Sequence, residues 1–164
     1  MKHQVYFVFI FSFILSSCVS VNLPSSTQKK AQNLQYTEPA EPFKVISDKT
    51  ADLAWSSKAT GNSISVLSDC TSNDSATEQI KLDTINSLSK LKVIKDEVIT
   101  YNGREALSSH VSGELDGVPV QMKVLVFKKN SCSFLISYVG VKKHFEKDLD
   151  KFNRFVEGFK VPSP

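Results

Sequence analysis

The sequence predicts an α+β fold in which an antiparallel meander sheet is flanked by two main helices. Three observations lead to this class. Runs of alternating apolar and polar residues, typical of strands, fill much of the second half of the chain. Asn102-Gly103 and Asp116-Gly117 are signatures of two-residue hairpin turns. Two apolar stripes with spacings of three and four residues predict amphipathic helices before and after these runs.

The first two strands are expected at Asp52–Lys58 and Asn62–Cys70, on either side of the turn-forming residues ATGN. In the second strand the period of two puts Ile64, Val66 and Cys70 on one face. Cys70 is therefore predicted on the apolar side of its strand.

A helix is predicted next, over Ser75–Leu91. Ser75 and Glu78 have the spacing of a capping box, which satisfies free amides at the start of a helix. Its core-facing stripe consists of Ile80, Thr84, Ile85, Leu88 and Leu91. The side chains predicted to face water are Lys81, Asp83, Asn86 and Lys90.

Four antiparallel strands follow as a meander: KVIKDEVITY, REALSSHVSGEL, VPVQMKVLVF and CSFLISYVG. A turn over Lys128–Ser131 precedes the last of them. One face of the third strand carries Val118, Val120, Met122, Val124 and Val126. One face of the fourth carries Cys132, Phe134, Ile136 and Tyr138.

The last helix is predicted within Val141–Val161. Its apolar stripe consists of Phe145, Leu149, Phe152, Val156 and Phe159, and Phe155 widens it. Such an aromatic stripe fits a cofactor box or a core that covers a sheet face. We prefer the core, and we predict no bound cofactor.

The first residues read as a secretory signal, because Lys2 precedes an apolar segment over Val5–Leu15. Leu15-Ser16-Ser17-Cys18 resembles the bacterial lipobox. That resemblance implies that Cys18 receives a diacylglyceryl group and becomes the first residue of the mature protein. An ordinary signal peptide and an uncleaved membrane anchor are the alternatives, although a spanning helix needs about 20 apolar residues.

These observations divide the chain into three parts. Residues 1–17 are a lipoprotein signal peptide, residues 18–42 hold the lipidated cysteine and a flexible tether, and residues 43–164 form the domain. The tether is predicted because this segment is poor in large apolar residues and cannot offset its ordering entropy. The expected location is the cell envelope, facing the periplasm, and Val19 after the cysteine favours the outer membrane.

Cys70 and Cys132 remain for a disulfide or for two free thiols. An oxidising compartment and the apolar side on which both are predicted favour the disulfide. It would add roughly 3–4 kcal/mol by the chain-entropy argument. No histidine lies close in sequence to complete a zinc site, and no CxxC pair is present.

Other chemistry is sparse. The formal net charge is only +3, and Arg104 and Arg154 are the only arginines, so nucleic acid is not an expected partner. His110 and His144 are both predicted to face solvent. The carboxylates Glu146, Asp148, Asp150 and Glu157 lie among lysines and are predicted to form solvated ion pairs. We therefore predict no catalytic and no metal-binding residues.

The order of elements resembles the PsbP-like α/β/α sandwich superfamily, which includes DcrB-like and LpqN-like envelope lipoproteins. The segments that carry the resemblance are ITYNGREAL, CSFLISYVG and FEKDLDKFNRFVEGFKV, within Asp52–Val161. These motifs are structural, and the superfamily offers no shared catalytic residues to transfer. The resemblance implies an accessory or binding protein.

Three functional hypotheses follow. The first is a non-catalytic, lipid-anchored envelope protein that reaches the membrane through Cys18 and binds a protein partner. The second is a carrier or sensor of a small apolar ligand held between sheet and helices. The third is a hydrolase, because a Ser/His/Asp triad assembles in space and leaves no sequence motif. We rank them in this order.

Overall fold

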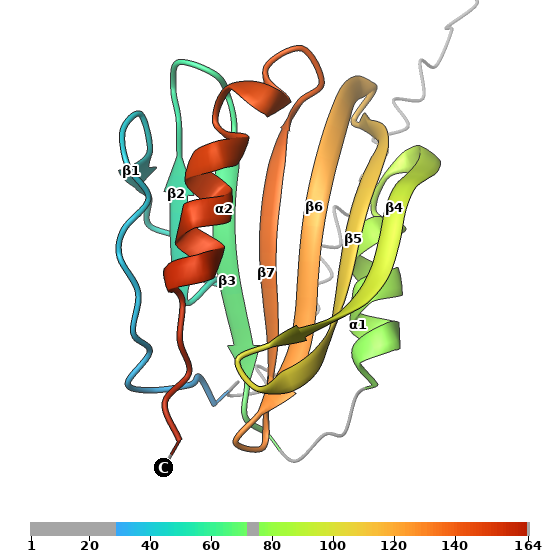
Figure 1. Ribbon diagram of the computed structural model, residues 1–164. Helices are drawn as coiled ribbons and strands as arrows, with labels where there is room; N and C mark the ends of the chain where they lie inside the picture. Colours follow the sequence, from blue (N-terminus) through green and yellow to red (C-terminus); the bar gives the residue numbers. More distant parts are fainter. Residues whose placement is uncertain (1–28, 72–75, 164) are drawn as a thin grey trace, which may run out of the picture.

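The computed structural model describes residues 29–71 and 76–163, and it contains one seven-stranded antiparallel sheet with strand order β1-β2-β3-β7-β6-β5-β4 (Figure 1). The strands are β1 (Lys44–Val45), β2 (Leu53–Ser56), β3 (Ser63–Asp69), β4 (Ser89–Tyr101), β5 (Arg104–Leu115), β6 (Val118–Lys129) and β7 (Cys132–Val141). The helices are α1 (Thr77–Ile85), the 3-10 turn η1 (Phe145–Lys147) and α2 (Leu149–Gly158). The predicted α+β class is confirmed.

The molecule has three layers, with α2 and α1 on opposite faces of the sheet (Figure 1). In Figure 1, α2 lies in front of β2 and β3, with β7 beside it, and leaves β4 and β5 uncovered on that side. No helix in the described part of the chain is long and apolar enough to cross a membrane.

Aromatic side chains fill the space between the sheet and α2. Tyr138 from β7 packs against Phe145 and Phe152, with ring centroids 4.7 and 5.1 Å apart. Trp55 from β2 packs edge-on against Phe155 at 5.1 Å. All five side chains are at most 3% exposed. The phenylalanine stripe is therefore core, as the sequence indicated.

The second core lies between the sheet and α1. Alternate residues of β6 face it, as the period of two requires: Val120, Met122, Val124 and Val126. Ile85 and Leu88 cover them. One prediction fails here, because Lys81 is buried rather than exposed to water. Its ammonium group lies 2.9 Å from carboxylate oxygens of both Glu78 and Asp96.

Helix α1 is shorter than the predicted Ser75–Leu91, because it ends at Ile85 and β4 starts at Ser89. Leu88 and Leu91 keep their contact with the core from the connection and from the strand. The apolar spacing thus continued past the true end of the helix. The N-cap residue is Ala76, which offers no side-chain hydrogen bond. Ser75 lies outside the described residues.

The final helix is also shorter than predicted. Val141 closes β7, Phe145 lies in η1, and α2 covers only Leu149–Gly158. The 3-10 turn keeps Phe145 in the aromatic core at 0% exposure, although its backbone is not α-helical.

Residues 29–42, which the sequence assigned to the flexible tether, pack against the domain instead. Gln35 and Lys160 exchange backbone hydrogen bonds of 3.0 and 2.7 Å. The Tyr36 ring lies 5.8 Å from that of Trp55, and Leu34 contacts the same core. These few apolar residues are enough to order the segment, because the aromatic core offers them packing partners and Lys160, outside the named strands, offers Gln35 a backbone partner. The predicted boundary at residue 42 is therefore wrong for 29–42, and residues 18–28 lie outside the described part.

Candidate functional site

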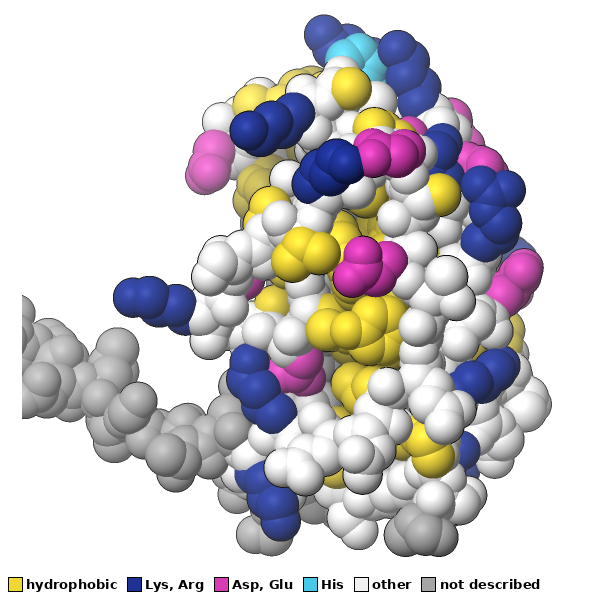
Figure 2. All heavy atoms as spheres, turned by 90° about the vertical axis from the view of Figure 1, so that its left-hand side faces the viewer, with side chains coloured by type: hydrophobic (Ala, Val, Ile, Leu, Met, Phe, Trp, Pro, Cys, Tyr) yellow, Lys and Arg dark blue, Asp and Glu magenta, His cyan; other side chains and the backbone are white. Residues whose placement is uncertain are grey.

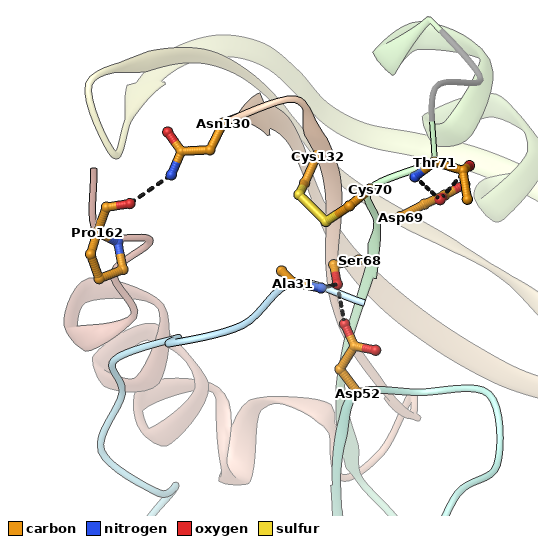
Figure 3. Close-up of a disulfide and its surroundings, with 9 residues drawn as sticks. All are labelled: Ala31, Asp52, Ser68, Asp69, Cys70, Thr71, Asn130, Cys132 and Pro162. Carbon is orange, nitrogen blue, oxygen red and sulfur yellow. Dashed lines mark hydrogen bonds between the residues drawn. A yellow bond between two sulfur atoms is a disulfide. The ribbon is translucent and has the colours of Figure 1, made fainter. Parts of the chain in front are cut away.

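Cys70 and Cys132 are joined in a disulfide that links the end of β3 to the start of β7 (Figure 3). Cys132 is 8% exposed, on the face that carries Phe134 and Ile136. A surface hollow of about 350 Å³ adjoins the bond, lined among others by Lys29, Lys30, Asn130 and Ser131. This volume lies at the lower limit of ligand-binding pockets.

The same end of the molecule is held by hydrogen bonds between distant segments (Figure 3). The amide of Ala31 donates to Ser68 Oγ at 2.7 Å, and that hydroxyl donates to Asp52 at 2.5 Å. The side-chain amide of Asn130 donates to the carbonyl of Pro162 at 2.6 Å. We call this region, with the Tyr101–Arg104 turn and Lys160, the disulfide end.

A second candidate lies on the α2 side of β4, β5 and β6. Five polar side chains here are half-buried although Figure 1 shows no helix in front of β4 and β5. They form what we call the polar sheet face: Glu97, Ser108, His110, Gln121 and Lys123. Polar groups held on rigid strands in this way are suited to positioning a partner.

Lys123 is the most perturbed group of this face. Burial lowers the pKa of its ammonium group, and nearby Lys95 lowers it further, while Glu97 and Glu146 act in the opposite direction. Its Nζ lies 6.0 Å from the centroid of the Phe152 ring. Perturbed lysines are enriched at functional sites, although structural networks perturb them too.

The two histidines are less exposed than predicted. His110 is half-buried, with its ring stacked 5.2 Å from that of Phe145 and its Nε2 2.8 Å from the Gln121 side-chain oxygen. His144 is also half-buried, and its Nδ1 lies 3.0 Å from the Thr60 carbonyl oxygen. Within residues 29–71 and 76–163, neither ring is hydrogen-bonded to a serine, cysteine or carboxylate side chain.

Asp148 was predicted on the surface, but it is 2% exposed. Its carboxylate accepts hydrogen bonds from Thr60 at 2.6 Å and from Asn62 at 2.9 Å, and Lys151 lies 3.3 Å away. These contacts tie the β2–β3 turn to the start of α2. Asp150 follows the prediction, because it is exposed and pairs with Arg154 at 2.8 Å.

Two predictions remain, the lipidation of Cys18 and the lack of a metal site. Cys18 lies outside the described residues, so its lipidation stays a prediction. Among the described residues, no three His, Cys, Asp or Glu side chains are grouped to hold a metal ion.

Sequence reasoning missed the disulfide-end hollow and the polar sheet face. Lys29 and Lys30 were assigned to a tether, so no pattern placed them beside Asn130. The pairing of His110 with Gln121 and Lys123 could have been found, because the Asp116-Gly117 turn fixes their register.

Comparisons with solved structures show the fold class. LpqN, described as involved in cell envelope biogenesis of Mycobacterium tuberculosis, superposes with a TM-score of 0.62 at 10% identity, covering 84% of this chain and 88% of LpqN. The PsbP protein of Synechocystis sp. PCC 6803 gives 0.55 at 11% identity, covering 90% and 99%. A candidate regulator of unknown function from Pseudomonas aeruginosa gives 0.52 at 14% identity, covering 87% and 90%.

The chain therefore has the PsbP-like fold that its element order resembled. No protein family and no curated protein matches it by sequence.

Proposed function

We propose that the protein is a lipid-anchored, non-catalytic component of the cell envelope whose domain binds another protein through β4 and the adjoining polar sheet face. One observation carries the binding role. β4 is one of the two edge strands of the sheet, and it exposes Val93, Ile94 and Val98 at 58%, 53% and 62%. Val93 and Val98 are in register with Val111 and Leu107, on the α1 side of the sheet, whereas the polar sheet face lies on the α2 side. A partner that contacts both therefore reaches around the β4 edge. Exposed apolar groups together with half-buried polar ones have the composition of a protein interface.

The contact is made through side chains rather than by adding a strand. β4 carries Lys90, Lys92 and Lys95, and its pairing with β5 shifts register at two places. Lysines and bulges on an edge strand disfavour indiscriminate pairing with other strands. A partner that packs against the side chains of β4, without pairing with its backbone, is not hindered by these lysines and bulges.

The anchor rests on the lipobox resemblance of Cys18. LpqN is described as an envelope-biogenesis protein, which is consistent with this location. The non-catalytic role is supported by the contacts of His110 and His144 with an amide oxygen and a backbone carbonyl. The apolar-carrier alternative is weaker, because the aromatic side chains themselves occupy the space between α2 and the sheet.

Labelling with palmitate tests the anchor. We expect label in the wild-type protein and none in Cys18→Ala, together with an intact mass that begins at an acylated Cys18. A mature protein without acyl chains would contradict the proposal.

Site-specific photo-crosslinking in cells tests the partner. A photoreactive residue at Ile94 or Val98 should give the same crosslinked protein at both positions. Val45, on the opposite edge strand and 64% exposed, is the matched control and should not give it. Val98→Lys should abolish the crosslink from position 94 while changing stability by less than about 0.5 kcal/mol. Equal yields at Val45 would rule out β4 as the interface.

A further inference from the structure

We infer that the disulfide end docks on anionic lipid headgroups of the bilayer that holds the anchor. The inference rests on the proposed function, because it requires acylated Cys18. It adds an orientation for the domain and a second contact with the membrane. Two independent observations carry it: the place at which the chain enters the domain, and the charges around that place.

The chain enters at the disulfide end. The carbonyl of Lys29 accepts a hydrogen bond from the amide of Cys70 at 2.8 Å, so this residue is fixed beside the disulfide. Only residues 19–28 separate Lys29 from Cys18. Fully extended, they span roughly 35–40 Å. β6, with 12 residues, is itself roughly 40 Å long. With a lipid on Cys18, the opposite end can face the bilayer only if this segment is almost fully extended, which is entropically costly. The anchor therefore favours the orientation with the disulfide end next to the bilayer.

Cations from separate segments converge at this end. Lys29, Arg104 and Lys160 are exposed and form no ion pair within the described part of the structure. Asn102 holds two of their segments together, because its side chain bonds the Phe159 carbonyl at 3.1 Å and the Val161 amide at 3.0 Å.

The acidic groups nearby are Asp48, Asp52, Asp69 and Glu105. Asp52 pairs with Lys30 at 3.2 Å, and Asp69 accepts two hydrogen bonds from Thr71. Asp48 and Glu105 are exposed. The cations outnumber these four carboxylates, because Lys30 and Lys129, whose ammonium group donates to the Asn102 carbonyl at 3.1 Å, add to the three named above. Positive charge is therefore in excess where the chain meets the membrane, and clusters of lysines next to an anchor attract anionic headgroups.

The hollow beside the disulfide is a concave site within this positively charged region. Its volume of about 350 Å³ accommodates a phosphate-bearing headgroup, and its lining combines Lys29 and Lys30 with the polar turn Asn130-Ser131. Ammonium groups and polar donors together suit a headgroup whose only charge is its phosphate diester better than a zwitterionic headgroup, in which the diester is accompanied by a cation.

Charge alone does not select this end. Lys92, Lys142 and Lys143 at the opposite end are also exposed and form no ion pair among the described residues. Figure 2 shows Lys and Arg side chains at both ends of the β1 side. The two ends differ in that the chain enters the domain at the disulfide end. The lysines of the opposite end therefore serve as an internal control for membrane contact.

Lysine acetylation of the acylated protein in lipid nanodiscs tests the inference. One set of discs contains phosphatidylcholine only, and the other contains 30% phosphatidylglycerol. We expect acetylation of Lys29 and Lys160 to slow about fivefold in the anionic discs. Lys142 and Lys143 should change less than about twofold. In the variant R104Q/K160Q, the protection of Lys29 should fall.

The other outcomes overturn the inference. Equal protection at both ends, protection of Lys142 and Lys143 only, or no protection would each contradict it. Slowing at Lys29 caused by inorganic phosphate in phosphatidylcholine discs at constant ionic strength would identify a free-anion site instead. An intact mass of the same sample without acyl chains overturns the proposed function, and this inference with it. An acylated protein with equal labelling overturns the inference alone.

Discussion

Gly140 shows how a single position constrains the β7 strand. A Cβ atom built there would lie 2.0 Å from Asn62 Oδ1 and 2.9 Å from its Cγ. Asn62 cannot move aside easily, because it is 0% exposed and its amide group donates to Asp148 and to the His144 carbonyl. The absence of a side chain at position 140 is what allows the buried asparagine to lie against the strand.

Gly140→Ala should therefore lower the free energy of unfolding by about 2–3 kcal/mol, which is the range of overpacked cores. Urea unfolding followed by the fluorescence of Trp55 measures the change. Gly158→Ala is the matched control, because no atom lies within 4 Å of the added Cβ. Gly158 closes α2, so its replacement by alanine should be neutral or should stabilise by up to about 1 kcal/mol. A Gly140→Ala protein as stable as the control would show that Asn62 is free to shift.

At the scale of elements, α1 is joined to β4 by the buried Lys81. Burial disfavours its charge, but hydrogen bonds to Glu78 and Asp96 outweigh that effect and raise the pKa of Lys81. Hydrogen bonds from Ser109 and Lys81 lower the pKa of Asp96 below its ordinary value of 3.8. Ionised Asp96 therefore adds to the free energy of unfolding above about pH 4. This stabilisation is lost as the pH falls through the lowered pKa of Asp96 in the folded protein. The contribution of Lys81 is lost only at strongly alkaline pH.

Asp96→Asn should destabilise the protein by about 1 kcal/mol at pH 7, a modest amount because the Asp96 side chain is 46% exposed and solvent screens the pair. The difference from the wild type should shrink as the pH falls below about 4. Urea unfolding at pH 7, 5 and 3 gives the dependence. The exposed Asp83 on α1 is the control, and Asp83→Asn should change stability by less than about 0.5 kcal/mol. A difference that grows in acid would contradict the assignment.

The strands and helices also show how much of the fold could be predicted from the sequence. Six of the seven strands in the described part of the chain were predicted, because the period of two and the turns at Asn102-Gly103 and Asp116-Gly117 are local signals. The two-residue strand β1 is too short for such a signal and was not predicted. The ends of the helices were predicted less well. Leu88, Leu91 and Phe145 have helical spacing in the sequence, but they lie in a connection, a strand and a 3-10 turn.

The candidate site was harder to predict than the sheet. A sequence pattern does not reveal that residues 29–42 add to an existing core. Nor does it show that Asp148 is buried by partners more than 80 residues away in the chain, as the bonds to Thr60 and Asn62 require.

At the scale of the whole molecule, the disulfide connects two parts of the sheet that are distant in the sequence. The β2–β3 hairpin and its partner β7 are separated in sequence by α1 and the β4–β6 meander, and the sulfur atoms close a separation of 62 residues. The end of β3 also holds Lys29, because the Cys70 amide donates a hydrogen bond to the Lys29 carbonyl. Loss of the bond should therefore weaken both the fold and the attachment of the N-terminal segment.

Reduction, or the double variant Cys70→Ala/Cys132→Ala, should lower the free energy of unfolding by about 4 kcal/mol on the chain-entropy argument for this loop. For a domain of this size the melting temperature should fall by roughly 10 °C. Amide hydrogen exchange should show the largest loss of protection at residues 29–36 and 67–70, whereas β5 and β6 keep theirs until global unfolding. Uniform loss across the sheet would mean that the bond stabilises only by constraining the unfolded chain. Preferential loss near Lys29 would show that the same bond fixes the N-terminal segment to the domain.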